Sequence, residues 1–183
     1  TDGLTVGGIG ATTGVTTNNG DITLLSGATL TLTEDVSAGG TSTISLTSTS
    51  NNIEQTGGNL TATNLLAVAA SGANLQRVGN DVTTVAGNIT GTGAFTFQDA
   101  NSLIVGSVLG TNGITTTTGG DIALTSLSGG ITVNQAVTAG GTGNITLTTT
   151  SGAGAGTLTL NANVDAAGDD IFLVSADGIN QTG

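Results

Sequence analysis

Apolar and polar residues alternate along this chain in short runs. In each run an Ile, Leu, Val or Phe is followed by one Thr, Ser or Ala and then by another large apolar residue, and the runs end near Gly, Asn, Asp or Ser. The clearest runs are Leu30–Leu32, Ile44–Leu46, Phe95–Phe97, Ile122–Leu124, Ile131–Val133, Ile145–Leu147 and Leu158–Leu160. A two-residue period bounded by turn formers is typical of β-strands, and no segment shows the 3.6-residue period of an amphipathic helix. The pattern predicts an all-β protein.

The chain also contains a long internal repeat, in which residues 101–183 repeat the pattern of residues 1–100 in the same order. The matching blocks are Leu4–Gly7 with Leu103–Gly106, Gly14–Thr17 with Gly113–Thr116, Gly20–Leu24 with Gly120–Leu124, and Val36–Gly40 with Val137–Gly141. The offset drifts from 99 to 101 along the repeat. This drift falls in Gly-containing connections, where loops accept an added residue.

A shorter period lies inside each long repeat. We place strand starts near residues 4, 22, 44, 66, 89, 103, 122, 145 and 171, with one or two further short strands between successive starts. A period of roughly 20 residues that holds two or three short strands is typical of a β-solenoid. The sequence therefore predicts one β-solenoid segment over residues 1–183, with about eight rungs stacked about 4.8 Å apart.

One irregularity supports the solenoid over a sandwich or a barrel. Ile53–Gly57 recurs as Ile179–Gly183, at an offset of 126 instead of 101, so the second repeat carries one extra rung near residues 152–177. A solenoid accommodates an added rung because each rung contacts only its neighbours. Because the last residues stop inside a repeat, we also expect the segment to be a fragment of a longer protein.

Composition narrows the chemistry that the chain can carry. Only 7% of its residues are charged, the net charge is −11, and Arg77 is the one cation; Cys, His, Pro, Met, Trp and Tyr are absent. Without Cys or His there are no thiolate or imidazole metal sites and no Cys or His nucleophile. A single Arg cannot form a basic surface for nucleic acid or anionic lipid, and no apolar run approaches the roughly 20 residues of a membrane span. We predict no cofactor, no enzymatic activity, no nucleic-acid partner and no membrane insertion.

Acidic turns are the main candidates for a metal site. They are Asn18–Asp21, Asn80–Asp81, Gly120–Asp121 and Gly168–Asp170. Carboxylate oxygens are ligands for Ca²⁺, and the adjacent Asp169 and Asp170 form the best, though weak, candidate. The nonapeptide pattern of calcium-binding β-rolls is missing, and Asp or Asn before a strand is an ordinary turn residue. We interpret these residues as structural turns.

Other candidate residues also have simpler interpretations. Glu34 and Asp35 are adjacent, so they point to opposite faces of a strand and cannot form the carboxylate pair of a glycosidase, and Glu54 is isolated. The Thr-x-Thr runs that resemble ice-binding arrays do not recur at one position in every rung, and we interpret them as surface Thr ladders. We expect the three Phe residues, Phe95, Phe97 and Phe172, to fill the core. The stretch 151–156 has no Lys and reads as a corner or an excursion, not as a phosphate-binding loop.

Several blocks resemble the repeats of filamentous-haemagglutinin-like adhesins, the large β-strand-repeat surface proteins of Gram-negative bacteria. These blocks are Gly20–Leu24, Ile53–Gly58, and Asn88–Ala100 with Leu103–Gly106. The resemblance covers nearly the whole chain. It implies a right-handed single-stranded parallel β-helix, export through an outer-membrane partner in the two-partner manner, an extracellular or cell-surface location, and a role in adhesion, aggregation or biofilm.

Taken together, these features lead to a functional hypothesis with two alternatives. We expect a non-enzymatic structural shaft of a secreted or surface-displayed adhesin, which acts as a rigid spacer that contacts a host or cell surface. The absence of Cys suits a chain that crosses the periplasm unfolded. The first alternative is a self-assembling extracellular filament subunit that stacks end to end through uncapped rungs. The second is a carbohydrate- or calcium-binding module.

Overall fold

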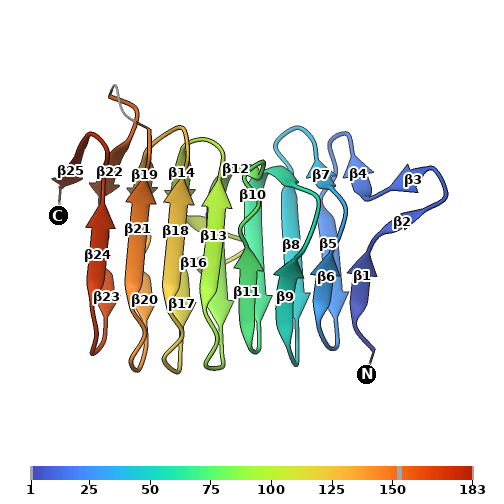
Figure 1. Ribbon diagram of the computed structural model, residues 1–183, viewed down its shortest axis with the longest axis horizontal. Helices are drawn as coiled ribbons and strands as arrows, with labels where there is room; N and C mark the ends of the chain where they lie inside the picture. The colour runs from blue at the N-terminus through green and yellow to red at the C-terminus, as the bar shows by residue number, and fades with distance from the viewer. Residues whose placement is uncertain (1, 152–153, 183) are drawn as a thin grey trace.

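The computed structural model describes residues 2–151 and 154–182. In these ranges the chain winds through about eight stacked turns into a flattened rod, with the first and last turns at opposite ends (Figure 1). Nearly all the strands pair in parallel with strands one turn away, so the molecule is a β-solenoid, as the alternating pattern predicts. The described ranges contain strands and turns, and none of them forms a helix suited to crossing a membrane.

One side of the rod is an eight-stranded parallel sheet with one strand from each turn. Its strands, in spatial order, are β1 (Leu4–Val6), β6 (Leu30–Leu32), β9 (Asn52–Gln55), β11 (Gly72–Leu75), β13 (Phe95–Asp99), β18 (Ile122–Ser126), β21 (Ile145–Thr149) and β24 (Ile171–Val174). The register of this sheet pairs apolar residues of successive turns: Leu30 pairs with Ile53, and Ile122 pairs with Ile145. Eight strands in this sheet confirm the predicted number of rungs.

A thirteen-stranded sheet forms the other sides of the rod. Its strands are β4 (Val15–Thr17), β5 (Ile22–Ser26), β7 (Val36–Ala38), β8 (Thr43–Ser48), β10 (Leu60–Ala69), β12 (Asp81–Ile89), β14 (Leu103–Val105), β17 (Ile114–Thr116), β19 (Ile131–Val133), β20 (Val137–Ala139), β22 (Thr157–Leu160), β23 (Val164–Ala166) and β25 (Gly178–Gln181). In most turns two short strands lie on these two sides, one on each side. In two turns a single long strand covers both sides: β10 pairs with β7 and β8, and β12 pairs with β10 and β17. The strand starts predicted near residues 66 and 89 are therefore wrong, since Leu66 lies inside β10 and Ile89 ends β12.

Two small antiparallel hairpins interrupt the winding. The first joins β2 (Gly8–Ile9) to β3 (Thr12–Thr13), and the second joins β15 (Ser107–Val108) to β16 (Thr111–Asn112). The sequence pattern did not predict either hairpin, because two-residue strands are too short to show an alternation. The two hairpins occupy equivalent positions in the two long repeats.

Columns of apolar side chains fill the interior of the rod. One column of the thirteen-stranded sheet contains Ile22, Ile44, Leu65, Val85, Val105 and Val133, all buried. Phe95 and Phe97 are buried as expected, but the core position expected for Phe172 is wrong, because its side chain is 49% exposed. In β24 the inward positions begin at Ile171, so Phe172 falls on the outer face, where it pairs with Thr146.

The chain completes a further turn after β21. Ile145 pairs with Ile171 of β24, and β25 pairs with β22, so residues 157–181 stack onto the preceding turn. This turn covers most of the region in which the repeat arithmetic predicts an extra rung. Of the Gly-rich stretch 151–156, residues 152 and 153 lie outside the described residues.

Candidate functional site

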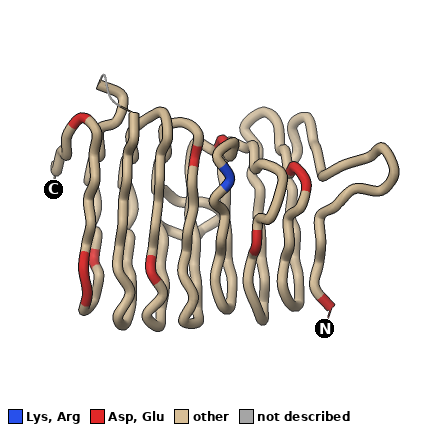
Figure 2. The backbone as a smooth tube through the Cα atoms, viewed as in Figure 1, with Lys and Arg blue, Asp and Glu red and all other residues tan. Residues whose placement is uncertain are grey.

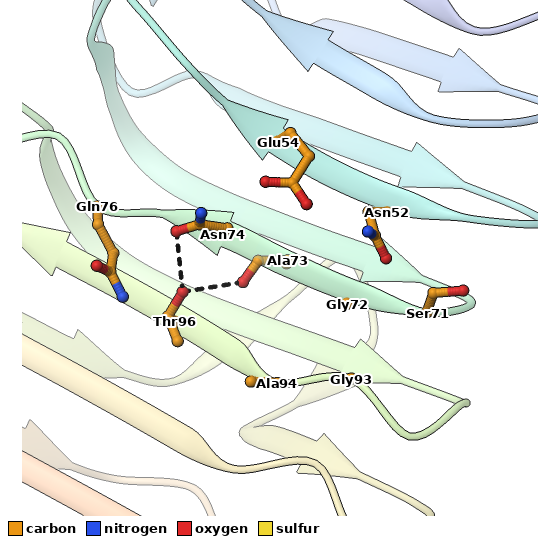
Figure 3. Close-up of a pocket in the computed structure, with 10 residues that line it drawn as sticks. All are labelled: Asn52, Glu54, Ser71, Gly72, Ala73, Asn74, Gln76, Gly93, Ala94 and Thr96. Carbon is orange, nitrogen blue, oxygen red and sulfur yellow. Dashed lines mark hydrogen bonds between the residues drawn. The ribbon is translucent and has the colours of Figure 1, made fainter.

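A shallow hollow lies on the outer surface of the eight-stranded sheet near the middle of the rod. It has a volume of about 350 Å³ and lies across β9, β11 and β13 (Figure 3). Its lining residues are Asn52, Glu54, Ser71, Gly72, Ala73, Asn74, Gln76, Gly93, Ala94 and Thr96. Most of these side chains occupy the outward positions of the three strands, so the alternation that builds the core also creates this surface.

Small residues produce the recess. Asn52 pairs with Gly72, and a Cβ atom on Gly72 would lie 3.2 Å from the carbonyl oxygen of Ala94 in the next turn. Beside this gap the outward side chains of Glu54 and Asn74 occupy paired positions on neighbouring strands. The hollow is therefore a gap in a lattice of outward side chains and not a cleft between structural units.

The side chains of the hollow offer hydrogen bonds but no acid–base pair. Thr96 Oγ1 donates to the carbonyl oxygen of Ala73 and to Asn74 Oδ1, both at 3.3 Å (Figure 3). Glu54 is the one carboxylate among the lining residues, and the amide groups beside it are neutral. No aromatic ring lines the hollow to stack on a sugar. This arrangement is suited to weak polar contacts and not to bond cleavage.

Three aspartates at the turns bind the backbone of the next turn. Asp21 Oδ1 accepts a hydrogen bond from the N–H of Thr43 at 2.7 Å, and Asp121 Oδ1 accepts one from Asn144 at 2.8 Å. Asp35 Oδ1 likewise accepts from the N–H of the residue that precedes β10, at 2.7 Å. Asp21 and Asp121 are equivalent residues of the two long repeats, and they make equivalent bonds. Each of these carboxylates therefore fastens one turn to the next.

The calcium candidates Asp169 and Asp170 lie in the exposed corner before β24. The backbone N–H of Asp170 donates to Asn144 Oδ1, and its carbonyl oxygen accepts from Ile145, both at 3.0 Å. Across the described residues no group of three or more Asp, Glu, His or Cys side chains is placed to hold a metal ion. Among the described residues no third acidic ligand lies beside this pair, and Asp169 and Asp170 stay a weak calcium candidate.

Gln55 and Asn80 are two buried amide side chains at one edge of the core. The amides of Gln55 and Asn80 bond reciprocally, with N···O distances of 2.7 and 3.0 Å. Asn80 also accepts from the N–H of Leu60 at 2.9 Å and donates to two backbone carbonyl groups. Through the buried Asn80 these bonds join Gln55 of β9, Leu60 of β10 and Gln98 of β13, and they help to hold the three strands in register.

Asp99 is the most perturbed ionisable group of the described chain. Its carboxylate is fully buried and accepts from the N–H groups of Val82 at 2.9 Å and Asn101 at 2.8 Å. Burial raises the pKa of Asp99 from its ordinary value of 3.8 to about 6, because desolvation outweighs the two hydrogen bonds, and the charge of Asp81 adds to the rise. Asp177 shows the opposite shift, since the N–H groups of residues 154–156 bond to its carboxylate and lower its pKa.

The burial of Asp99 could be predicted from the alternation of its strand, although the composition of the chain does not indicate it. In the run from Phe95 to Asp99 the inward positions are Phe95, Phe97 and Asp99, so the alternation itself directs the carboxylate toward the core. The same cannot be said of Asn80, which lies in a turn without periodicity.

The remaining charges are spread over the rod. Acidic residues occur singly or in adjacent pairs along the length of the molecule, and Arg77 is exposed near its middle (Figure 2). Searches against protein-family models, curated proteins and solved structures return no match to this chain.

Proposed function

We propose that this chain is part of the structural shaft of a filamentous adhesin, secreted or displayed on the surface of a Gram-negative bacterium. The observation that supports the proposal is the unbroken ladder of the eight-stranded sheet, in which every turn between β1 and β24 is hydrogen-bonded to the turns on both sides. Such a rod gains length by adding turns, and each turn contacts only its neighbours. In this role the protein carries no catalytic or cofactor site.

Rigidity comes from two sets of bonds between turns. Backbone hydrogen bonds of the parallel ladders run along the axis of the rod, and side chains such as Asp21 and Asp121 add bonds at the corners. Because the interior is filled by Ile, Leu, Val and Phe, bending the rod would open the packed columns. A stiff spacer of this kind would hold a binding tip away from the cell.

Export and partners follow from the same proposal. We expect an outer-membrane secretion partner that passes the chain unfolded, and the chain has no Cys that disulfide formation in the periplasm would trap. The contact with a host or cell surface would be made elsewhere in the adhesin.

A deletion of one complete turn tests the shaft directly. Ile122 and Ile145 are paired residues of successive turns, so removal of residues 122–144 joins Asp121 to Ile145 in register and shortens the rod by about 4.8 Å. Small-angle scattering should show the shorter rod with its fold retained. When a binding tip is displayed on the variant, its affinity should be unchanged and its reach shorter.

The outcome that contradicts the shaft is specific binding by this segment itself. Saturable binding of the purified chain to cells or glycans that is lost in Glu54→Ala or Asn74→Ala would assign function to the hollow instead. Thr146→Ala is the matched control, because Thr146 lies outward on the same sheet and does not line the hollow.

A second candidate function is a self-assembling filament subunit. It is supported by four large apolar side chains exposed on the last described turn, namely Ile171, Phe172, Val174 and Ile179. If the chain stacks end to end, sedimentation velocity should show polymers that grow with concentration, and Ile171→Asp should return the protein to a monomer. A monomeric wild-type chain at high concentration would rule out this function and leave the shaft untouched.

A further inference from the structure

The two hairpins are equivalent parts of the two long repeats. At an offset of 99 residues Gly8 corresponds to Ser107 and Ile9 to Val108, and the pairing is the same, Ile9 with Thr12 and Val108 with Thr111. Each hairpin has a two-residue loop and leaves the rod directly after the strand that begins its long repeat, β1 or β14. The last residue at the base of each hairpin is also equivalent, Gly14 in the first and Gly113 in the second.

A glycine with positive φ ends both hairpins. Gly14 has φ 72° and Gly113 has φ 70°. An added Cβ would lie 2.2 Å from the carbonyl oxygen of Asp35 at Gly14, and 1.9 Å from that of Ala136 at Gly113. Because both glycines meet the following turn in the same way, the two hairpins leave the rod with the same local geometry.

The second hairpin folds back over the two turns that precede it. Val108 is only 3% exposed and packs with Leu66 of β10 and Ala86 of β12, which form a small apolar cluster on the outer face of the sheet. The base of the hairpin is fixed by hydrogen bonds from Gly113 N to Gly106 O at 2.8 Å and from Gly87 N to Gly113 O at 2.9 Å. This hairpin therefore clamps three successive turns together.

The first hairpin has a similar β-branched apolar residue, Ile9, at the docking position, but nothing to dock against. Ile9 is 88% exposed, the highest value of any large apolar residue in the described chain. The hairpin extends past β1, away from the rest of the rod, where two further turns would lie (Figure 1). An Ile placed where its counterpart is buried is unfavourable in water unless it is covered.

We propose that hairpin β2–β3 is a docking element for two further solenoid turns of the β10–β13 kind, stacked in line on β1. Ile9 would take the place of Val108 and pack on an outward pair equivalent to Leu66 and Ala86. The partner must carry an apolar outward pair like Leu66 and Ala86 of β10 and β12, because the paired positions of the earlier turns are the polar Ser45 and Thr23. The β10 and β12 surface of a second folded copy does not qualify, since its own β15–β16 hairpin already covers it. The proposal depends on the fold alone and not on the adhesin function.

A tandem chain supplies this partner without altering any turn. Residues 1–102 followed directly by residues 4–183 place the downstream Leu4 where Leu103 stands, so the downstream Ile9 faces the upstream Leu66 and Ala86. Because the natural chain has no Cys, a single Ile9→Cys substitution gives one thiol for labelling with a maleimide. We expect the downstream Ile9→Cys thiol to react at least tenfold more slowly than the upstream one, and as slowly as Val108→Cys in the single chain.

Two further variants make the result decisive. Leu66→Asn in the upstream copy should restore fast labelling of the downstream thiol, whereas Leu25→Asn, at a side chain that is 63% exposed, should not. Equal labelling rates for the upstream and downstream Ile9→Cys thiols would overturn the proposal. A tandem chain that fails to unfold cooperatively in urea would also overturn it, because Leu4 would then not substitute for Leu103.

Discussion

The buried carboxylate of Asp99 predicts an unusual dependence of stability on pH. Its side chain is fully buried at the edge of the core, with hydrogen bonds only from the backbone N–H groups of Val82 and Asn101 among the described contacts. Ionisation in this position removes a charge from water without a cation to compensate. Hence the pKa of Asp99 rises to about 6 in the folded protein.

The sign and size of the effect follow from linkage. Because the folded state holds the proton more tightly than the unfolded chain, Asp99 imposes no penalty below pH 3.8, and stability falls as the pH rises through the window from 3.8 to about 6. The difference between these two values corresponds to roughly 3 kcal/mol of unfolding free energy at pH 7.5. About half of that loss falls between pH 5 and 7.5.

Urea unfolding at pH 5.0 and 7.5 measures this loss. The chain has no His, the side chain that normally titrates there. We expect the unfolding free energy to drop by about 1.5 kcal/mol between the two pH values, with an unchanged dependence on urea concentration.

Asp99→Ser should remove this drop. Ser126, the residue paired with Asp99 in the next turn, shows that a hydroxyl fits this column, since its Oγ donates to the carbonyl oxygen of Gly129 at 2.8 Å. Asp165→Asn, at an exposed carboxylate, is the control for the net charge of −11 and should keep the drop. If wild-type stability is flat from pH 5.0 to 7.5, or if Asp99→Ser declines like the wild type, the assignment of the effect to Asp99 is refuted.

Three further substitutions probe the packing. Asn80→Ala strips the buried N–H of β10 of its acceptor and should lower the unfolding free energy by about 3 kcal/mol in urea titrations. Gly87→Ala would place a Cβ 2.2 Å from the buried ring of Phe95, so we expect a loss of about 2 kcal/mol and a lower thermal midpoint by calorimetry. Val108→Asp should cost about 3 kcal/mol, whereas Ile9→Asp should leave the single chain unchanged; equal effects would contradict the docked and undocked states of the two hairpins.

Most of the fold could be predicted because it depends on two patterns that can be read directly from the sequence. Alternation places each side chain in or out, the repeat offset fixes how turns correspond, and together they predict a solenoid of eight turns. The unbroken strands β10 and β12 had a weaker signal: no Gly lies between Gly58 and Gly72, but Asn64 lies inside β10 and Gly87 inside β12, where turn formers would favour a corner. The alternation of Ile171, Phe172 and Leu173 places Phe172 outward, so its position in the strand decides its exposure and its aromatic character does not.

The candidate site was less predictable because its contacts join residues from different turns. The hollow depends on small residues at 72 and 94 that lie side by side only after the register is set. Composition alone argues that Asp99 is at the surface, where carboxylates normally lie. In the structure Asp99 is buried instead, because its carboxylate accepts hydrogen bonds from two backbone N–H groups at the edge of the core.

The length of the long repeat explains why equivalent strands lie on different sides of the rod. Leu4, Leu30, Ile53, Ala73 and Phe95 are paired in succession on the eight-stranded sheet, so Phe95 lies four turns after Leu4. Leu103, the equivalent of Leu4, comes eight residues after Phe95 and lies in β14 of the other sheet. One long repeat therefore spans four turns and part of a fifth, and it carries every equivalent feature to the next side of the rod. The hairpins after β1 and β14 obey this rule, so clamps of the β15–β16 kind in a longer array would follow a spiral around the rod and brace it on more than one side.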